Sequence, residues 1–575
     1  MINSFKKNKI ASLLAGIGLV STVIVASVPQ AQPVTHSVIV QGTNLAAVKM
    51  AVEASGGTIS HELGVIRGVA VDLTDAQMSS LRTASVITHI FDNVSVKTAA
   101  RPVKSSSLLT TSSDSTTNTV EQVIDDTGHT TLVNADLLHA EGITGAGVTV
   151  AVLDTGLFDE RAIIKNTSNQ TRVLAQFDAL SGQEVFALEN TDLSGHGAHI
   201  AGTILNKEIS RDTKKSRGLA PDADLVVVRG FDASGQGSYA DVIRGIDWVV
   251  NHKDEHNIRI LNLSLSAPPQ SHYWDDPLNQ AVMAAWQADI VVVASAGNRG
   301  PEPMTIGVPG NVPYVITVGA MTDNYTANET GDDRLTVFSS AGPTFEGFVK
   351  PEMIAPGGHI VSTMSKESQI AALHPEFYDD SLYYFTMSGT SQSAAVVSGV
   401  AALMLQADPS LSADDVKCRL IASARPAMDA AGNFIYSPFQ QGAGLINAYD
   451  AVNSTATGCA NQGLNIENDL AGIAHYGGSA RQDAEGNFYI QGQEGLLWNG
   501  SFASNDGFLW ADGFLWADGY LWADGFLWAD GYLWADGFLW SDGFLWSDGY
   551  LWADGFLWND SHVAPVSINN WVAQE

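Results

Sequence analysis

The feature that most constrains the fold is an uncharged run from Ser381 to Ala407. From Gln392 onward its small and apolar residues cover every side of a helical wheel, which predicts a helix buried all round. The run contains Gly389-Thr-Ser391. A tight glycine turn there would place the Ser391 hydroxyl at the helix N-terminus, where free N–H groups and the dipole favour negative charge. Three interpretations stay open on this run alone: a nucleophile, a serine-capped core helix and a membrane span.

Short apolar runs rich in β-branched residues alternate with amphipathic segments in the middle of the chain. The runs are 148–153, 225–228, 258–265, 290–293 and 315–318, and the amphipathic segments include 239–252 and 277–286. Doubly buried strands alternating with helices predict an α/β fold, with a parallel sheet covered by helices on both faces. Functional groups gather beyond the strand carboxyl ends in such sheets. Asp154 follows the first run directly and Asn298 follows the fourth, so we expect both at that edge.

Two histidines, His196 and His199, stand three positions apart in a segment rich in glycine and alanine. On a helix they could ligate a metal ion. No third His, Cys or acidic ligand stands at zinc spacing nearby, so we do not predict a metal site there. The domain therefore carries an Asp, a His, an Asn and a Ser at four separate element ends.

Three motifs around these residues resemble the active-site motifs of subtilisin-like serine peptidases. They are Val152-Leu-Asp154-Thr-Gly156, His196-Gly-Ala-His-Ile-Ala-Gly202 and Gly389-Thr-Ser391-Gln-Ser393. The chain order Asp, His, Ser is also that of subtilisin. The resemblance implies a subtilisin-like peptidase domain over residues 131–453, with Ser391 as nucleophile, His196 as general base, Asp154 as its orienting group and Asn298 as an oxyanion donor. It implies no catalytic cofactor, and structural Ca²⁺ whose ligands the sequence does not assign.

The resemblance extends to segments that would bind a protein or peptide substrate. Gly235-Gln-Gly237-Ser-Tyr239 resembles the edge strand that pairs with substrate backbone, and Leu263-Ser264-Leu265-Ser266 resembles the opposing one. Gly307 resembles the glycine that leaves the primary pocket deep, which implies large apolar side chains at P1. The chain departs from the family where Thr, Gly, Arg and Pro are common, with Ala198, Ser266, Ala341 and Ala395. These departures leave the fine specificity open.

The N-terminal residues 1–31 predict an export signal. Lys6, Lys7 and Lys9 precede an uncharged run over 10–28, which small residues follow. Cleavage after Ser27 and after Ala31 both fit, and the run is also long enough for an uncleaved anchor. We therefore expect a secreted, extracellular protein, free or attached to the cell surface, in which Cys418 and Cys459 form a disulfide.

Residues 34–98 show a β-α-β-β-α-β pattern typical of a small α+β, ferredoxin-like unit. In the light of the resemblance they look like the family's inhibitory prodomain, which assists folding and blocks the active site until it is removed. A separate binding domain is the alternative. The Ser/Thr-rich segment 99–130 predicts a flexible linker, with the processing cut between Val96 and Thr131.

The C-terminal part has a different character. Helical and parallel-strand patterns stop in the connecting region 454–505. Residues 506–560 carry nine hexads of the form Asp-Gly-Phe/Tyr-Leu-Trp-Ala/Ser, the last of which ends in Asn559, before a tail over 561–575. The Asp-Gly pairs favour an antiparallel meander of short strands. A β-solenoid that stacks the Asp residues around Ca²⁺ is the alternative. The aromatic repeats would bind the cell surface, carbohydrate or a polymeric substrate, or would pack on themselves or on another copy.

The formal net charge of the chain is −33, which excludes nucleic acid as a partner. A surface this acidic could not neutralise phosphates. The sequence as a whole predicts a secreted subtilisin-like serine endopeptidase, made as a proenzyme that processes itself. A catalytically idle surface or adhesion protein, in which the repeats bind the ligand, is the alternative.

Overall fold

The computed structural model describes residues 34–93, 128–211, 213–326, 330–379, 383–429, 432–502 and 567–568. The predicted export signal, the linker up to residue 127 and the hexad repeats lie outside these residues. The predicted extent of the linker needs one correction. Helix α3 (His129–Leu132) begins before Thr131, and Thr130 is buried and donates its hydroxyl proton to the carbonyl of Ser216. This contact, distant in sequence, extends the folded domain toward the N-terminus.

A nine-stranded sheet forms the centre of the larger domain. Its order is β13-β12-β11-β9-β5-β8-β6-β7, with β14 also paired to β12. The pairs are parallel except for β7 and β13, which pair antiparallel at the ends. The strands are β5 (Thr149–Asp154), β6 (Val173–Asp178), β7 (Gln183–Val185), β8 (Asp224–Arg229), β9 (Ile258–Leu263), β11 (Val291–Ser295), β12 (Ile316–Thr322), β13 (Arg334–Leu335) and β14 (Met353–Pro356). The predicted α/β sheet is confirmed.

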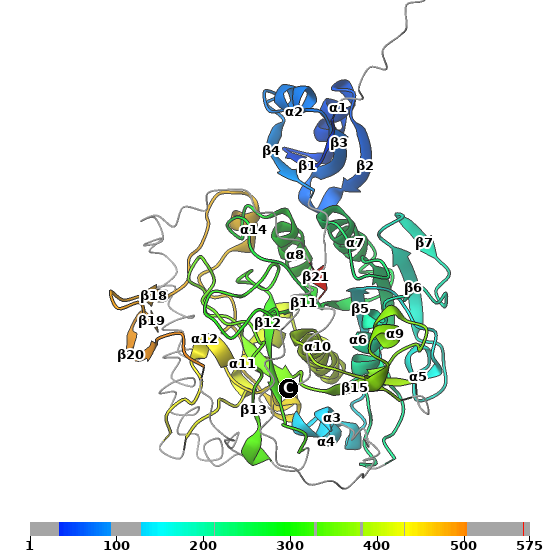
Figure 1. Cartoon of the computed structure of the whole chain (residues 1–575), viewed down its shortest axis with the longest axis vertical. Helices are drawn as coiled ribbons and strands as arrows, with labels where there is room; N and C mark the ends of the chain where they lie inside the picture. Colours follow the sequence, from blue (N-terminus) through cyan, green and yellow to red (C-terminus); the bar gives the residue numbers. More distant parts are fainter. Residues whose placement is uncertain are drawn as a thin grey trace, which may run out of the picture.

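Two pairs of helices cover this sheet. Figure 1 shows β5 and β11 between the pair α7 (Tyr239–Asn251) and α8 (Pro277–Gln287) and the pair α6 (His196–Leu205) and α10 (Thr390–Ala407). Helix α10 is buried on all sides from Thr390 to Leu405, as its uncharged run predicts. No helix in the described part of the chain is long and apolar enough to cross a membrane. Helix α10 is therefore a core helix.

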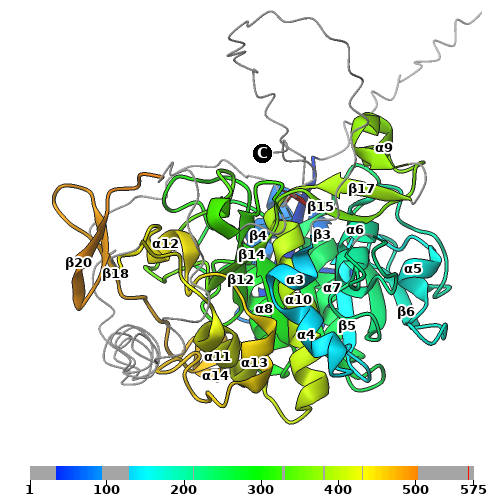
Figure 2. The same cartoon turned by 90° about the horizontal axis from the view of Figure 1, so that it is seen from below.

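Smaller elements surround this centre. They are α4 (Ala135–Ala140), α5 (Arg161–Ile164), α9 (Gln369–Leu373), α11 (Ala413–Ser423), α12 (Pro438–Gln441) and α13 (Ala448–Asn453), with an antiparallel sheet of β15 (Ile360–Thr363), β17 (Tyr384–Met387) and β16 (Tyr378–Asp379). This sheet lies on the opposite side of the molecule from the C-terminal sheet of β18 (Ala480–Gln482), β19 (Phe488–Ile490) and β20 (Gln493–Trp498) (Figure 2). The elements β15 and β17 contribute to the surroundings of α6, as described below.

The N-terminal module comprises β1 (His36–Gly42), α1 (Leu45–Ala54), β2 (Thr58–Leu63), η1 (Gly64–Ile66), β3 (Gly68–Leu73), α2 (Asp75–Leu81) and β4 (Ile87–Asp92). Its four antiparallel strands have the order β2-β3-β1-β4. Successive side chains of a strand point to opposite faces. Val38 and Val40 of β1 therefore fill the module's own core, whereas Ile39 between them joins the core of the large domain. The module lies against α7 and α8 (Figure 1).

The connecting region is more structured than its sequence pattern predicts. It contains α14 (Ile466–Leu470) and the antiparallel strands β18 (Ala480–Gln482), β19 (Phe488–Ile490) and β20 (Gln493–Trp498). Buried Asp469 of α14 accepts hydrogen bonds from the hydroxyls of Tyr273 and Tyr314, and Phe439 packs against Trp498 with ring centroids 5.9 Å apart. The connecting region is ordered because its side chains contact partners in the large domain. Local sequence periodicity does not reveal such distant partners.

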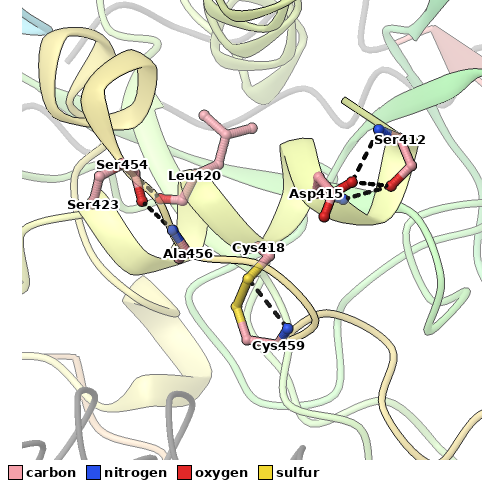
Figure 3. Close-up of a disulfide and its surroundings, with 8 residues drawn as sticks. All are labelled: Ser412, Asp415, Cys418, Leu420, Ser423, Ser454, Ala456 and Cys459. Atoms are coloured by element: carbon pink, nitrogen blue, oxygen red, sulfur yellow. Dashed lines mark hydrogen bonds between the residues drawn. A yellow bond between two sulfur atoms is a disulfide. The ribbon is translucent and has the colours of Figure 1, made fainter. Parts of the chain in front are cut away.

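A disulfide fastens this region to the large domain, as predicted. It joins Cys418 on α11 to Cys459, with the Cα atoms 5.3 Å apart (Figure 3). The backbone N–H of Cys459 also donates to the sulfur of Cys418. A cross-link across 41 positions of sequence restricts the unfolded chain and contributes about 4 kcal/mol to stability in the chain-entropy account.

Candidate active site

An aspartate and a histidine meet where β5 ends and α6 begins. Asp154 is the last residue of β5, and His196 is the first residue of α6. The Nδ1 atom of His196 lies 2.7 Å from Oδ1 of Asp154, and the exposed fractions of the two side chains are 0% and 1%. Because the hydrogen bond to the carboxylate places the proton on Nδ1, it leaves the other ring nitrogen, Nε2, as an acceptor.

A second aspartate, which the sequence reasoning missed, fixes the start of α6. Asp192 accepts hydrogen bonds from the backbone N–H groups of Gly195 at 2.8 Å and Ala198 at 2.7 Å. The hydroxyl of Thr155 donates to Asp192 and accepts from the N–H of Gly197, each at 2.8 Å, which ties α6 to the end of β5. Burial raises the pKa of Asp192 although these hydrogen bonds oppose the shift. The sequence could have indicated this role, because an aspartate that stands just before a glycine at a helix start commonly caps the helix.

Ser391 lies in the first turn of α10, and its hydroxyl donates to the carbonyl of Ser264 at 3.3 Å. The Ser264 hydroxyl in turn donates to the carbonyl of Ser391 at 2.9 Å. Helices α6 and α10 pack together, and Gln392 lies 3.4 Å from Nδ1 of His199, one turn beyond His196. The structure thus brings the first turns of the two helices together. The Nε2 atom of His196 is buried and has no hydrogen-bond partner among the described residues.

Asn298 lies beyond the end of β11 with its side chain held by α10. Its Oδ1 accepts from the backbone N–H of Thr390 at 3.0 Å and from the Thr390 hydroxyl at 2.9 Å. Because Oδ1 faces two donors, Nδ2 must face away from them, and it has no partner among the described residues. A Cβ on Gly389 would lie 3.3 Å from this Nδ2 and 2.8 Å from Oε1 of Gln392. Glycine at position 389 therefore permits the close approach of Asn298 to the start of α10.

The two segments expected to pair with substrate differ in structure. The strand β9 ends at Leu263, and the short strand β10 (Leu265–Ser266) begins just after Ser264. The other segment, Gly235 to Tyr239, contains no named strand among the described residues, although Ser238 forms an isolated β-bridge. Gly235 lies in a turn with φ of +69°, Ser238 caps α7, and Tyr239 opens α7 as a buried residue. Ser238 and Asp241 form the capping box that starts α7, so pairing of the preceding residues from Gly235 to Gly237 with substrate backbone stays a prediction.

The space beside Gly307 is narrower than the resemblance implies. The hydroxyl of Ser266 occupies the position that a Cβ on Gly307 would need, and a Cβ on Gly297 would lie 2.7 Å from the same oxygen. Hydrogen bonds between Ala267 and Val308 hold the two segments together. The Ser266 hydroxyl is buried without a partner among the described residues. The expectation of a deep space for large apolar P1 side chains therefore has to be revised.

The second histidine of α6 belongs to the core. The Nε2 atom of His199 donates to the carbonyls of Ile360 at 3.0 Å and Phe385 at 3.1 Å, in β15 and β17. Burial lowers the pKa of His199 to about 3, so the ring stays neutral. In the part of the chain that the structure describes, no group of three or more His, Cys, Asp or Glu side chains could hold a metal ion. The expected structural Ca²⁺ stays a prediction, because carbonyl oxygens can also bind this ion.

Comparison with known proteins places this fold and its motifs in one family. Residues 145–444 match the family model described as the subtilase family. The chain is 39% identical to serine protease AprX of Bacillus subtilis (strain 168), over 55% of this chain and 68% of that protein. It is 32% identical to subtilisin DY of Bacillus licheniformis, over 55% of this chain and 94% of that protein.

A solved structure with a similar fold is that of fervidolysin from Fervidobacterium pennivorans, described as a keratinolytic enzyme related to subtilisin. It aligns with a TM-score of 0.54 and 21% identity, over 75% of this chain and 62% of that chain. The matched relatives are named as serine proteases, and the family match spans the strand and helix ends that carry Asp154, His196, Asn298 and Ser391. The chain belongs to the subtilase family and is a serine peptidase of the subtilisin type.

Proposed function

We propose that this chain is a secreted serine endopeptidase that uses Asp154, His196 and Ser391 as a triad and is made as a self-processed proenzyme. One observation carries the proposal. His196 is oriented by a 2.7 Å hydrogen bond to Asp154, and its Nε2 is left without a partner among the described residues. A buried imidazole nitrogen that accepts nothing is costly for a core residue. It is what a general base requires.

The proposed reaction uses only groups of this chain. The Ser391 hydroxyl turns from the carbonyl of Ser264 to Nε2 of His196, which takes its proton as Oγ attacks the substrate carbonyl carbon. His196 then gives that proton to the leaving amine, while Asp154 stabilises the imidazolium. Water hydrolyses the resulting acyl-enzyme by the same route in reverse.

Negative charge on the carbonyl oxygen would be stabilised from two sides. Nδ2 of Asn298 is one such donor, since it has no partner among the described residues. The backbone N–H of Ser391 is the other, since the first N–H groups of a helix have no partner within the helix. Fixed donors of this kind contribute about 10²- to 10³-fold each to turnover. An extended peptide would reach these groups by pairing with Leu265 and Ser266.

The contacts of the N-terminal module support its role as a prodomain over residues 34–98. His61 lies 2.9 Å from Asp241 and the N–H of Val65 donates to Asp247 at 2.6 Å, both aspartates being on α7. The module's last described residue, Asn93, accepts from the N–H of Ala240 at the start of the same helix. A free binding domain would not place Ile39 in the core of another domain. We therefore propose that the module assists folding, inhibits the enzyme and is cut off between residues 96 and 131.

The remaining expectations stay proposals. They are export through residues 1–31, structural Ca²⁺, and binding of a cell-surface or polymeric ligand by the repeats. A truncation separates the repeats from catalysis. A chain ending after Phe502 keeps the α14 and Trp498 contacts and should cleave small peptides as the full chain does. A chain ending after Ala460 loses Asp469 and should be destabilised.

A serine-directed phosphonate probe tests the catalytic assignment. We expect the probe to label the processed wild type and to leave Ser391→Ala unlabelled and unprocessed. Ser393→Ala is a matched control, because Ser393 lies two residues further along α10 and its hydroxyl only donates to the carbonyl of Ala355. This control should be labelled like the wild type. Processed wild-type protein that takes up no probe would refute the proposal and favour the idle adhesion protein.

A further inference from the structure

A segment from the far C-terminal end of the chain lies on the expected substrate edge. Strand β21 (Ser567–Ile568) pairs antiparallel with β10, with Ile568 opposite Leu265 and Ser567 opposite Ser266. The two strands form a sheet of their own, and β21 is the short red strand next to β11 in Figure 1. More than 300 positions of sequence separate the partners.

The position of β10 relates this pairing to the proposed catalytic site. One side of β10 is fixed to the domain, since the carbonyl of Leu265 accepts from the hydroxyl of Ser295 at 2.9 Å and Ala267 pairs with Val308. Ser264 lies just before β10, and its carbonyl accepts a hydrogen bond from the hydroxyl of Ser391. Strand β21 therefore pairs with an edge that leads directly to the proposed nucleophile.

The direction of β21 is that of a substrate. Strand β10 runs away from Ser264, so the antiparallel β21 runs toward it, from Ser567 to Ile568. A peptide that Ser391 cleaves must run in the same direction along β10. Its scissile bond then lies at Ser391, and the residues N-terminal to that bond lie further along β10. The C-terminal segment thus occupies the edge as the acyl part of a substrate would.

Burial of the site agrees with an occupied edge. The side chains of Ser391 and His196 have no exposed area, and Leu265 has none either. A nucleophile that must contact a peptide cannot do so while it is covered. The nucleophile and the edge beside it are therefore both covered in this structure.

We propose that the segment containing Ser567–Ile568 binds the substrate edge of its own chain at Leu265–Ser266 and competes there with external peptides. The inference rests on the proposed function and names an internal ligand for the same site. Main-chain hydrogen bonds supply the affinity, as in other cases of strand addition. Because the segment belongs to the same chain, its binding to β10 is intramolecular. The effective concentration of the segment at β10 is therefore high, and even weak strand pairing keeps it bound.

Hydrogen exchange in the full-length Ser391→Ala protein tests the pairing without any need for catalysis. In an antiparallel pair, one of two successive residue pairs exchanges both N–H···O bonds. At least one amide of Leu265 and Ser266 is therefore protected by β21. The double variant Ser567→Pro/Ile568→Pro cannot donate to β10, and we expect it to raise exchange at these amides by about tenfold or more. The double variant Val572→Pro/Ala573→Pro, placed beyond β21, should leave exchange unchanged.

Steady-state kinetics test the same two double proline variants in the active enzyme. We expect Ser567→Pro/Ile568→Pro to lower KM for a small peptide and to raise kcat/KM by about three- to tenfold at constant kcat, because a tethered competitor is removed. Equal exchange at Leu265 and Ser266 in both double variants would overturn the proposal, even for an inactive enzyme. Equal KM in both would overturn it as well. Loss of phosphonate labelling would refute the proposed function alone, since the exchange measurement stands without it.

Discussion

Two buried polar clusters in the same domain are built on opposite principles. In the first, Nζ of Lys350 donates to Glu352 at 2.6 Å, to the carbonyl of Val315 at 3.0 Å and to the Thr317 hydroxyl at 3.0 Å, which uses all three of its hydrogens. Lys417 lies 3.0 Å from the same carboxylate, whose other oxygen accepts from the N–H of Thr317. Every charged group in this cluster has its partners.

The proposed active-site cluster is equally buried, but several of its polar atoms have no partner among the described residues. Oδ2 of Asp154, Nε2 of His196 and Nδ2 of Asn298 have no partners among the described residues. An unsatisfied buried polar atom costs about 1–3 kcal/mol. This cluster, called the open cluster, is therefore less stabilising, but its atoms can react. The cluster around Lys350, called the closed cluster, stabilises the sheet. Substitutions in the two clusters should consequently affect different measurements.

The largest expected effect is that of Asp154→Asn. An asparagine can donate to Nδ1 of His196 and so favour the wrong tautomer, and triads lose about 10⁴-fold in kcat from this change. Stability should stay within about 1 kcal/mol, because the substitution removes a buried charge and keeps the shape. Steady-state kinetics and urea unfolding measure the two quantities. A kcat within tenfold of the wild type would show that Asp154 does not orient the base.

The opposite result is expected for Glu352→Gln. It leaves Lys350 and Lys417 buried without their negative partner, and breaking a buried ion pair in this way costs about 3–5 kcal/mol. Urea unfolding should be followed in the Ser391→Ala background, which prevents self-digestion. Glu62→Gln is the matched control, since it breaks the partly exposed pair with Lys49 and should cost less than about 1 kcal/mol. Equal losses in the two variants would contradict the contrast between the clusters.

The sequence predicted the open cluster better than the closed one. Strand patterns alone predicted Asp154 and Asn298 at one edge of the sheet and Ser391 at a helix N-terminus, and the family resemblance supplied their expected roles. The partners that hold them, Asp192 and Thr155, carry no such signal. Their contacts depend on how α6 meets β5.

The closed cluster and the connecting region were not predicted for a related reason. Lys417 reads as an ordinary helix-surface residue, yet it reaches the carbonyls of Pro313 and Tyr314, about 100 positions earlier. The helix α14 forms because Asp469 meets two distant tyrosines. Local periodicity reports which face of an element is buried, but not which remote polar group lies under that face.

The two histidines of α6 extend the comparison to pH. Burial lowers the pKa of His199 to about 3, below its ordinary 6.5, and nearby His196 adds to the shift. The unfolded chain therefore binds this proton first as pH falls, so the stability contribution is complete above about pH 6.5 and is lost on acidification toward pH 3. In Ser391→Ala/His199→Gln, the loss of unfolding free energy between pH 6 and 4 should be shallower by about 1 kcal/mol per pH unit. Parallel pH profiles with and without His199 would contradict this assignment.

The smallest effect concerns specificity and is expected at Ser266. Its hydroxyl fills the space between Gly297 and Gly307 and makes no hydrogen bond among the described residues. The proposed enzyme should therefore prefer small P1 side chains, and Ser266→Gly should raise the ratio of kcat/KM for P1 Phe over P1 Ala by about tenfold, the value of one or two methylene-sized groups.

Ser266→Ala separates space from polarity in that measurement. It removes the oxygen but keeps the Cβ, which would lie 3.2 Å from a Cβ on Gly307 and 3.4 Å from one on Gly297. The alanine variant should therefore shift the ratio by less than the glycine variant. If neither variant changes the P1 preference, Ser266 does not face the P1 side chain. In that case the Ser266 hydroxyl, which has no partner among the described residues, would be a feature of local packing outside the substrate site.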